Sequence, residues 1–377
     1  MQYAQYGKDG PTVSRLGFGV MRLPPTKGGG WGTVHFRKSV ALIRQALEAG
    51  VNFVDSHHNY HEGLSEVAIG KALKGWKGHR IYTQTKTPFY RNEPQRFFKQ
   101  LIEEALEKLG VNCIDYLFFH SMRMDMFEAR GKKFFSLTDW AMKKGYIRHR
   151  GFSSHDTPEH VKQFIDTGEF AAMLVSYNWQ NPTMAETIAY GADKGMGVAV
   201  MNPVGGGSLA VNTPSVLRLL PGAKSGAELA VRYVLATPGV SLTLSGMNTP
   251  EQVEENTRVA ARTTPMTPKQ WKAFDERLAK IQKRADAICT HCGYCMPCPN
   301  GVDIPGNFLL LSRAKFFEMT EYARARFRRM QKSRRHGDRS ALACVACGKC
   351  LPKCPNDVPI IEQLREVAEV LAPVSRT

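Results

Sequence analysis

Four polar residues in the first third of the chain have the side chains that carbonyl reduction needs. Asp55 ends the stretch VNFVD, Tyr60 lies in HNYHEG, Lys86 ends IYTQTK and His120 ends DYLFFH. Hydride addition to a carbonyl leaves an alkoxide, which requires a proton donor. Tyr60 is the expected donor, since a nearby ammonium lowers the pKa of a phenol. Lys86 would supply that ammonium and Asp55 would hold it in place. His120 would orient the carbonyl oxygen.

Eight of the nine cysteines fall in two short motifs near the C-terminus. Each motif has three cysteines at two-residue spacing, followed by a fourth cysteine and a proline: Cys289, Cys292, Cys295 and Cys298, then Cys344, Cys347, Cys350 and Cys354. Such spacing is typical of the ligands of [4Fe-4S] clusters, where the fourth cysteine of each motif serves the other cluster. Cys113 is expected to be a small buried apolar residue.

The motifs resemble those of bacterial-type two-cluster ferredoxins, and they predict crossed ligand sets. One [4Fe-4S] cluster would take Cys289, Cys292, Cys295 and Cys354, and the other Cys344, Cys347, Cys350 and Cys298. The alternative is two structural zinc sites. Zinc ribbons use two pairs of cysteines rather than four in a row with a trailing proline, so the spacing favours the clusters.

Short apolar or β-branched stretches alternate with helical patterns through residue 260. We expect eight strands, at 15–20, 51–55, 81–86, 115–120, 147–153, 173–178, 197–202 and 240–245. This alternation predicts an α/β fold, a parallel (β/α)8 TIM barrel, with a doubly wound sheet as the alternative. Asp55, Lys86 and His120 would then close three consecutive strands at the end of the barrel where active sites lie.

The rest of the pattern predicts three domains. Residues 1–266 would form the barrel, with an N-terminal hairpin that turns at residues 8–10 and covers its bottom. Residues 267–288 would form a linking helix that begins at a capping box, because Thr267 is followed by a proline and by Gln270. Residues 289–377 would form a helical, ferredoxin-like 2[4Fe-4S] domain.

The formal net charge of the 377-residue chain is +17, and much of the excess lies in residues 321–339. This stretch is either a solvated helix face or a docking surface for an acidic electron carrier such as a ferredoxin or flavodoxin. No nucleic-acid recognition motif accompanies it. The sequence has neither a long apolar run nor an N-terminal signal, and its cysteine spacing suits a reducing compartment. We therefore expect a cytoplasmic protein without a membrane span.

Residues 1–260 resemble the aldo-keto reductase family. The segments LGFGVMRLP, GVNFVDSHHNY, SEVAIGKAL, IDYLFFH, GFSSH and EQVEEN occur in the family's order. The resemblance implies a (β/α)8 barrel and NAD(P)H-dependent reduction of aldehydes or ketones. It also implies a tetrad in which Tyr60 is the acid, Lys86 and Asp55 tune it, and His120 orients the substrate. The fusion to a ferredoxin-like tail resembles a subset of this family.

The resemblance also implies nicotinamide contacts near the ends of the last four predicted strands. The matching positions are Ser153, Ser154, Asn178, Met201, Gly205, Gly206, Ser208, Gly246, Met247, Gln252, Glu255 and Asn256. Backbone amides of the glycine-rich loop at 203–208 could cradle a pyrophosphate. Gln252 stands where the family frequently has an arginine for the 2′-phosphate, and glutamine cannot replace that charge, so the sequence does not favour NADPH over NADH.

The two halves of the chain leave three functions open. The barrel moves a hydride, whereas each cluster moves one electron. In the first interpretation the barrel is an NAD(P)H-dependent reductase of a small carbonyl compound and also carries two clusters. In the second the clusters deliver electrons to the barrel site without nicotinamide, by way of a flavin or a radical. In the third the chain is a non-catalytic electron-transfer protein, which the intact tetrad disfavours.

Overall fold

The structure is a computed structural model that describes all residues except 31, 287–288, 290–292, 333–336, 355–356 and 373–377. The described chain divides into two compact units. One comprises residues 1–209 and 230–265, and the other residues 210–229 and 266–377.

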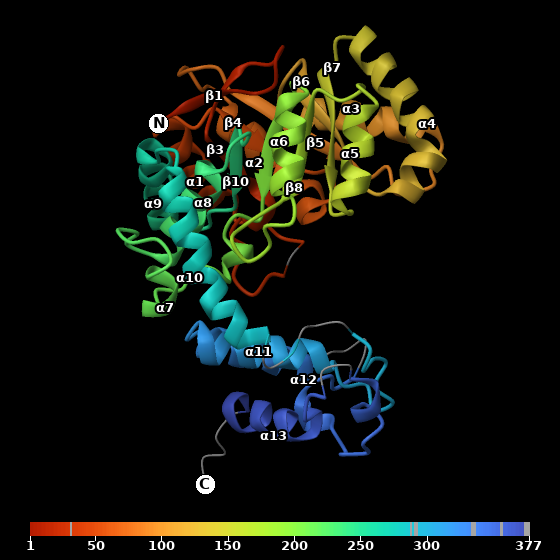
Figure 1. Ribbon diagram of the computed structural model, residues 1–377. Coiled ribbons are helices and arrows are strands. Elements are labelled where there is room, and N and C mark those ends of the chain that lie inside the picture. The colour runs from red at the N-terminus through yellow and green to blue at the C-terminus, as the bar shows by residue number, and fades with distance from the viewer. Residues whose placement is uncertain (31, 287–288, 290–292, 333–336, 355–356, 373–377) are drawn as a thin grey trace. The chain divides into compact units, whose positions relative to one another are not determined.

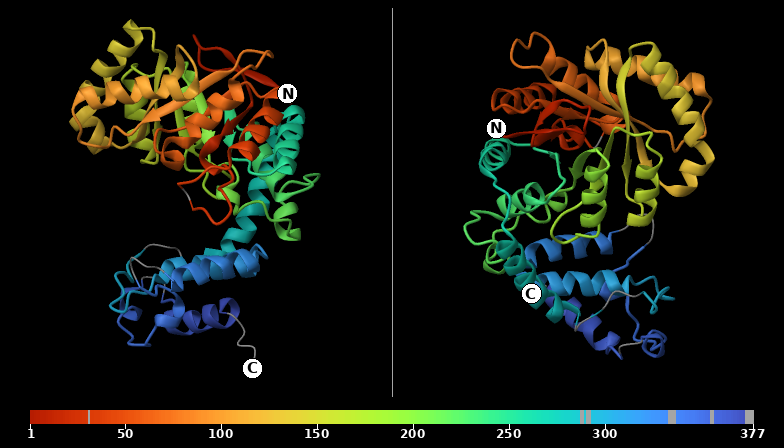
Figure 2. Two further views of the ribbon diagram at one scale, coloured as in Figure 1. Left: turned by 180° about the vertical axis from the view of Figure 1, so that it is seen from behind. Right: turned by 45° about the horizontal axis from the view of Figure 1, so that its top comes forward.

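The first unit is a closed barrel of eight parallel strands with helices around the outside (Figures 1 and 2). Its strands are β3 (Leu16–Gly19), β4 (Phe53–Asp55), β5 (Tyr82–Thr87), β6 (Ile114–Met122), β7 (Ile147–Ser154), β8 (Ala172–Ser176), β9 (Gly197–Met201) and β10 (Leu242–Ser245). Each strand pairs with the next, and β10 closes on β3. This confirms the eight predicted strands and excludes the doubly wound sheet.

Amphipathic helices follow the strands and bury one face on the barrel. They are α1 (Phe36–Glu48), α2 (Leu64–Leu73), α3 (Gln95–Leu109), α4 (Met124–Lys143), α5 (Pro158–Asp166), α6 (Ala185–Asp193), α7 (Pro214–Leu217), α8 (Gly226–Ala236) and α9 (Pro250–Arg262). In α3, Phe98, Leu101 and Ala105 recur at helical spacing and are buried. The helix ends where Gly110 adopts the left-handed conformation at φ 66°.

The predicted N-terminal hairpin closes the bottom of the barrel. Strands β1 (Tyr3–Gln5) and β2 (Thr12–Ser14) pair antiparallel. After β1, Tyr6 packs edge-on against Phe53 and Tyr116, with ring centroids 5.3 and 4.9 Å away. These rings belong to a buried cluster that includes Leu174 and Leu242 and fills the barrel. The interior is therefore a packed core, and chemistry is left to the opposite end.

The second unit is helical. It contains α10 (Pro268–Asp286), α11 (Ile304–Phe316), α12 (Thr320–Gln331) and α13 (Ile360–Leu371), and the last three lie side by side in both views (Figures 1 and 2). Thr267 and Gln270 form the predicted capping box at the start of α10. Among the described residues, no helix has both the length and the apolar character needed to span a bilayer.

Candidate active site

A buried ion pair links the ends of the second and third barrel strands. Lys86 Nζ donates to Asp55 Oδ1 and to the carbonyl oxygen of Ser56, the latter at 2.7 Å, and Gln84 Nε2 donates to Asp55 Oδ1 at 2.6 Å. Lys86 is 2% exposed and Asp55 is 5% exposed. Burial raises the pKa of Asp55 and lowers the pKa of Lys86, and the pairing of the two groups opposes both shifts.

Tyr60 lies beside this pair at the start of a short 3-10 turn (Tyr60–Gly63). Its backbone nitrogen donates to the carbonyl oxygen of His57 at 3.0 Å. His61 and Glu62 follow with φ near +55°, at 52° and 57°, a conformation that side-chain-bearing residues rarely adopt. Lys86 Nζ lies 5.4 Å from the centroid of the Tyr60 ring. The loop after β4 thus places the phenol over the ammonium.

His120 reaches the same place because β6 carries a bulge. The pairing of β6 with β7 shifts register between Phe119 and Met122, so one extra residue is inserted there. The His120 ring lies 6.4 Å from the ring of Tyr60 and 3.9 Å from that of His57, between centroids. Burial and the Lys86 charge lower the pKa of His120 to about 3, so its imidazole is neutral at pH 7. The structure therefore brings all four predicted residues together.

The pKa of Tyr60 corrects one expectation. Burial and the negative charge of Asp55 raise this pKa, whereas the sequence predicted that Lys86 would lower it. The physical reason is that Asp55 and the carbonyl oxygen of Ser56 engage the Lys86 ammonium. Tyr60 therefore holds its proton firmly at neutral pH and can release it only to a strong base such as an alkoxide.

The predicted nicotinamide contacts on β7 to β9 lie around the same end of the barrel, but several of their polar groups already have partners. Ser154 Oγ donates to the carbonyl oxygen of Met122 at 2.8 Å, and Ser153 Oγ accepts from the backbone of Ser121 at 2.9 Å. Asn178 Nδ2 donates to the carbonyl oxygen of Asn202 at 3.1 Å. Met201 packs against the barrel core. These groups shape the wall of the site.

The glycine-rich loop after β9 does not offer the expected amide cradle. The backbone nitrogens of Gly205, Gly207 and Ser208 donate to carbonyl oxygens of the loop itself, at 3.0, 2.9 and 3.2 Å. Gly205, Gly206 and Gly207 all have positive φ, between 57° and 95°, which tightens the turn. The prediction that the amides of Gly205 and Ser208 hold a phosphate is therefore wrong, because the turn consumes them.

A residue that the sequence analysis missed lies beside this loop. Arg22 follows β3, and a Cβ built on Gly206 would lie 2.9 Å from Arg22 Nη2. A Cβ built on Gly246 would lie 3.0 Å from Arg22 Cγ. The side chain thus runs between two glycines of the predicted cofactor loops, and it forms no ion pair within the described part of the chain. A free guanidinium there fits a phosphate or pyrophosphate. Its position after a predicted barrel strand was the available signal.

The residues after β10 form the opposite wall. Asn256 is buried and its Nδ2 donates to Ser245 Oγ at 3.0 Å, while Gln252 Oε1 accepts from the backbone of Asn248 at 2.9 Å. Met247 is buried and Gly246 is exposed. Glu255 is half-buried on α9. Both Gln252 and Asn256 thus use polar atoms to fix the loop between β10 and α9, which leaves Arg22 as the cation suited to a dinucleotide.

In the second unit, four of the predicted cluster ligands surround one cavity. Cys298, Cys344, Cys347 and Cys350 all line it, although Cys298 comes from the first motif. Burial raises the pKa of the Cys350 thiol, and the charges of the other three cysteines add to this shift. Asn300 Nδ2 lies 3.9 Å from Cys347 Sγ. These four thiols are the set predicted for one cubane cluster, and their arrangement fits one.

The other set is described only in part. Cys289, Cys295 and Cys354 are half-buried and pack against the same apolar core as the first set. Cys292 lies outside the described residues. The described residues include no group of three or more His, Cys, Asp or Glu side chains in the arrangement that holds a single metal ion.

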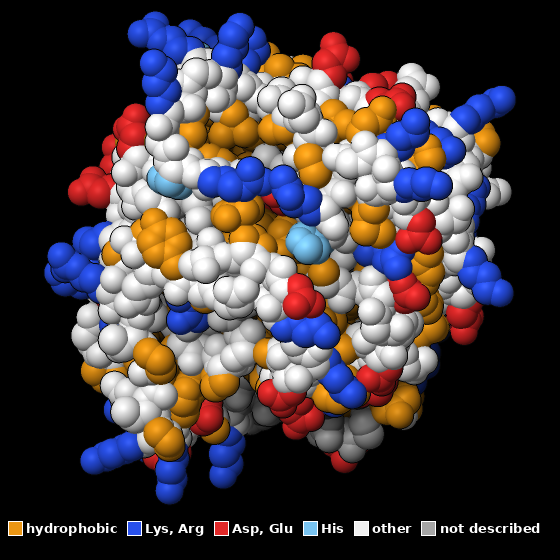
Figure 3. All heavy atoms as spheres, turned by 90° about the horizontal axis from the view of Figure 1, so that it is seen from above, with side chains coloured by type: hydrophobic (Ala, Val, Ile, Leu, Met, Phe, Trp, Pro, Cys, Tyr) orange, Lys and Arg blue, Asp and Glu red, His pale blue; other side chains and the backbone are white. Residues whose placement is uncertain are grey.

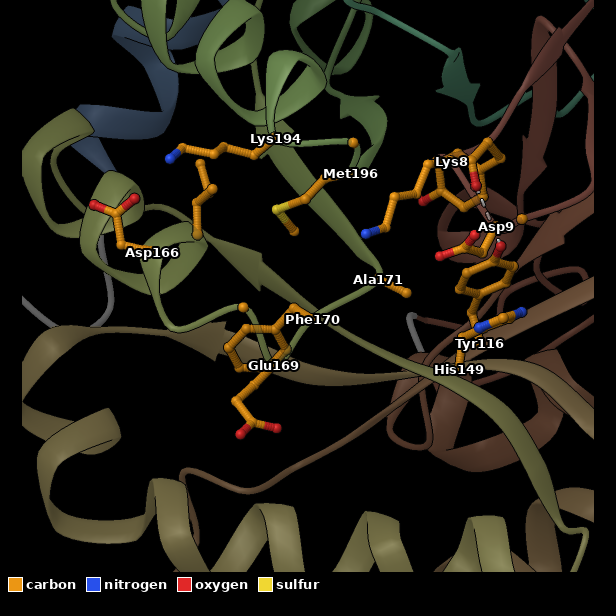
Figure 4. A pocket seen from close by; sticks show the side chains of 16 residues that line it. Lys8, Asp9, Tyr116, His149, Asp166, Glu169, Phe170, Ala171, Lys194 and Met196 are labelled. Atoms are coloured by element: carbon orange, nitrogen blue, oxygen red, sulfur yellow. Dashed lines mark hydrogen bonds between the residues drawn. The ribbon is translucent and has the colours of Figure 1, made fainter.

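A cavity of about 550 Å³ lies at the other end of the barrel and is a poor candidate for catalysis (Figure 4). Its carboxylates are engaged, since Glu169 pairs with Arg150 and Asp166 accepts from Tyr190. None of the four tetrad residues lines it. In the face drawn in Figure 3, basic side chains are interspersed with acidic and apolar ones. The positive charge there is dispersed and does not form a single patch.

Comparison with protein-family models gives two matches along the chain. Residues 15–215 match the aldo/keto reductase family, and residues 288–359 match a 4Fe-4S dicluster domain. The first match spans most of the barrel, and the second spans both cysteine motifs.

Curated relatives and solved structures resemble the barrel part. L-galactose dehydrogenase of Arabidopsis thaliana is 28% identical over 276 residues, which is 66% of this chain and 85% of the relative. NADH-specific methylglyoxal reductase of Escherichia coli is 24% identical over 295 residues, covering 65% of this chain and 89% of the relative. The structure of aldo-keto reductase AKR11C1 from Bacillus halodurans superimposes with a TM-score of 0.63 at 24% identity, covering 74% of this chain and 96% of that one.

Proposed function

Because the chain belongs to the aldo/keto reductase family and carries a C-terminal 4Fe-4S dicluster domain, we propose that its barrel reduces a small aldehyde or ketone with NAD(P)H. The observation that supports this most directly is the convergence of Tyr60, Lys86 and His120 at one end of the barrel. The two relatives named above are called a dehydrogenase of L-galactose and a reductase of methylglyoxal. Both names concern carbonyl chemistry.

Each side chain has a definite part in this proposal. Bound NAD(P)H supplies the hydride. Neutral His120 hydrogen-bonds the carbonyl oxygen and so orients the carbonyl carbon. Tyr60 hydrogen-bonds the same oxygen and transfers its proton as negative charge develops there. Lys86 stabilises the phenolate that remains, and Asp55 keeps the ammonium charged and fixed in the buried site.

Arg22 is the residue we propose for the diphosphate of the cofactor. Its guanidinium is the free cation between the loops that contain Gly206 and Gly246, and neither glycine position has room for a side chain. Gln252 carries no charge and is engaged with Asn248, so the site contains no dedicated partner there for a 2′-phosphate. NADH is therefore expected to serve at least as well as NADPH.

Replacement of Tyr60 by Phe tests the proposal. This change removes the proton donor without removing the ring, so we expect kcat for a reactive diketone with NADH to fall by a factor of about 10² to 10⁴. Tyr190→Phe is the matched control, because its hydroxyl lies on α6 and donates to Asp166. A Tyr60→Phe variant as fast as the control would remove Tyr60 from the mechanism.

For the second unit we propose two [4Fe-4S] clusters with the crossed ligand sets given above. Support comes from the single cavity shared by Cys298 and the second motif. Bound clusters would supply one-electron transfer. The protein's own contribution is to hold the thiols against a dry apolar core, since Cys298, Cys344, Cys350 and Cys354 all pack on a cluster that includes Phe308 and Leu311.

We also propose that helix α12 receives an acidic electron carrier. Arg326, Arg328, Arg329 and Lys332 are exposed and form no ion pairs within the described residues, and three of them line a groove of about 400 Å³. We call these four the α12 basic face. The opposite face of α12 buries Ala323 and Phe327 in the apolar core on which the cysteines pack. A carrier on the basic face would thus lie about one helix diameter, roughly 10 Å, from that core.

Charge reversal tests the carrier proposal. Arg328→Glu with Arg329→Glu should slow reduction of the clusters by flavodoxin at low salt, and the difference should shrink at high salt. Lys280→Glu with Lys283→Glu on α10 is the control, because it reverses two equally exposed charges elsewhere. Equal rates for the two double variants would mean that the α12 basic face is only solvated.

A further inference from the structure

The loop that carries Tyr60 also contains a buried histidine to which the proposed reaction gives no part. His57 is 2% exposed. The centroid of its ring lies 5.1 Å from that of Tyr60 and 3.9 Å from that of His120. His57 therefore lies among the rings that would hold the reacting carbonyl, although it lies outside the Asp55–Lys86 pair.

Hydrogen bonding fixes the tautomer of His57. Its Nδ1 accepts from the backbone nitrogen of Asn59 at 3.1 Å, so Nδ1 is unprotonated. Burial lowers the pKa of His57, and the positive charges that protonated His120 and Lys86 place beside it act in the same direction. A neutral imidazole with a free Nδ1 lone pair must carry its proton on Nε2. That Nε2–H is buried and has no hydrogen-bond partner in the structure.

A single carbonyl oxygen cannot satisfy every donor in this place. It has two lone pairs, and the proposed reaction fills them with Tyr60 and His120. The Nε2–H of His57 remains, and a buried donor without an acceptor is unfavourable. A second oxygen on the carbon next to the reacting carbonyl would accept from it. Lys86 is engaged with Asp55, so the donors facing the substrate are neutral and do not require a charged ligand.

We propose that His57 contacts the substrate, and that the substrate class of the barrel site is the vicinal dicarbonyls. This inference rests on the proposed carbonyl reduction. Hydride from NAD(P)H adds to one carbonyl carbon, Tyr60 gives its proton to that oxygen, and the products are NAD(P)⁺ and an α-hydroxycarbonyl compound. The second carbonyl keeps its bonding and accepts a hydrogen bond from Nε2 of His57.

Two ketones of equal length test the assignment. His57→Ala should lower kcat/KM for butane-2,3-dione by about 30-fold, and should change kcat/KM for butan-2-one by less than about 3-fold. His57→Gln retains a side-chain N–H and should recover part of the loss. His58→Ala, which removes the neighbouring imidazole, is the control and should leave the ratio of the two substrates unchanged. Equal losses for both ketones in His57→Ala would mean a structural role and would overturn the proposal.

A binding measurement separates this proposal from the proposed reaction. In ¹⁵N-histidine-labelled protein, the Nε2–H signal that His57→Ala removes should shift with butane-2,3-dione and stay unchanged with butan-2-one. If that signal shifts while neither ketone is turned over, the proposed reduction fails and the contact stands. If the signal does not move with butane-2,3-dione, the contact fails whether or not the protein is a reductase.

Discussion

At the scale of single residues, the site stores neutral hydrogen-bond donors around one buried ion pair. His57 and His120 are kept uncharged by burial and by the ammonium of Lys86. Tyr60 keeps its proton for the same physical reason, because burial opposes a phenolate. Charge appears in this site only when an alkoxide forms. A barrel end arranged in this way favours protonation of an oxyanion over binding of an anionic substrate.

Stability should fall with pH because of these histidines. The pKa of His120 is about 3 in the folded chain, against about 6.5 when unfolded, so the unfolded state binds more protons between these values. The stabilisation is complete above pH 6.5 and is lost as pH falls towards 3. At pH 5 we expect a loss of roughly 2 kcal/mol from His120.

Urea unfolding at pH 7 and pH 5 measures this loss. His120→Asn cannot titrate, so its free energy of unfolding should fall less than that of the parent chain over this interval. The groups that face His120 are Lys86, His57 and His155, and they remain in the variant. An identical fall in both proteins would show that His120 titrates normally in the fold.

The residue types of the tetrad were predictable from the sequence, but their electrostatics were not. Asp55, Lys86 and His120 each end an expected strand, so topology alone places them together. The direction of the Tyr60 pKa depends on how completely the loop after β4 buries the phenol and on Asp55 capturing Lys86. Neither is visible in the spacing. His57 was visible as a loop histidine, yet its burial and tautomer required coordinates.

At the scale of elements, the loops after the strands separate two tasks. Those after β4 to β6 carry the acid and the orienting imidazole, and those after β3, β9 and β10 frame the proposed cofactor site. The strands could be predicted because their apolar runs are short and bounded by helical patterns. The bulge in β6 and the internal bonds of the loop at 203–208 could not, because both arise from register and turn geometry.

Arg22 provides the prediction at this scale. Arg22→Ala should raise KM for NADH by about 10-fold or more, with a smaller change in kcat, because a charge-assisted bond to phosphate is made equally in the ground state and the transition state. Steady-state kinetics with NADH varied at saturating diketone measures this. Arg37→Ala removes an exposed, unpaired arginine of α1 and is the control. An unchanged KM would place the diphosphate elsewhere.

At the scale of the whole molecule, a hydride-transfer barrel shares one chain with a dicluster domain. The cysteine motifs announced the second unit because their spacing is specific. The segment at 210–229 belongs by its contacts to that second unit, although it lies between β9 and β10 in the sequence. Helical periodicity does not reveal such an exchange, since it reports which face is buried and not what covers it.

Crossed ligation predicts which cysteine variants behave alike. Cys298→Ala and Cys344→Ala should each disturb the same cluster, since both thiols line one cavity. Anaerobic iron and sulfide analysis should give about four of each per chain in either variant, against about eight in the parent chain. The double variant should lose no more than either single variant. A Cys298→Ala variant that instead loses the cluster of Cys289 and Cys295 would show uncrossed ligation.

The most direct test asks where the hydrogen on the reduced carbon comes from. The iron-loaded protein is incubated anaerobically with butane-2,3-dione and NADH that carries deuterium on the transferable position of the nicotinamide, and the product is examined by mass spectrometry. The account predicts one deuterium on the carbinol carbon of 3-hydroxybutan-2-one, and the same protein reduced with dithionite alone should give no product. Unlabelled product, or turnover driven by dithionite without NADH, would contradict it.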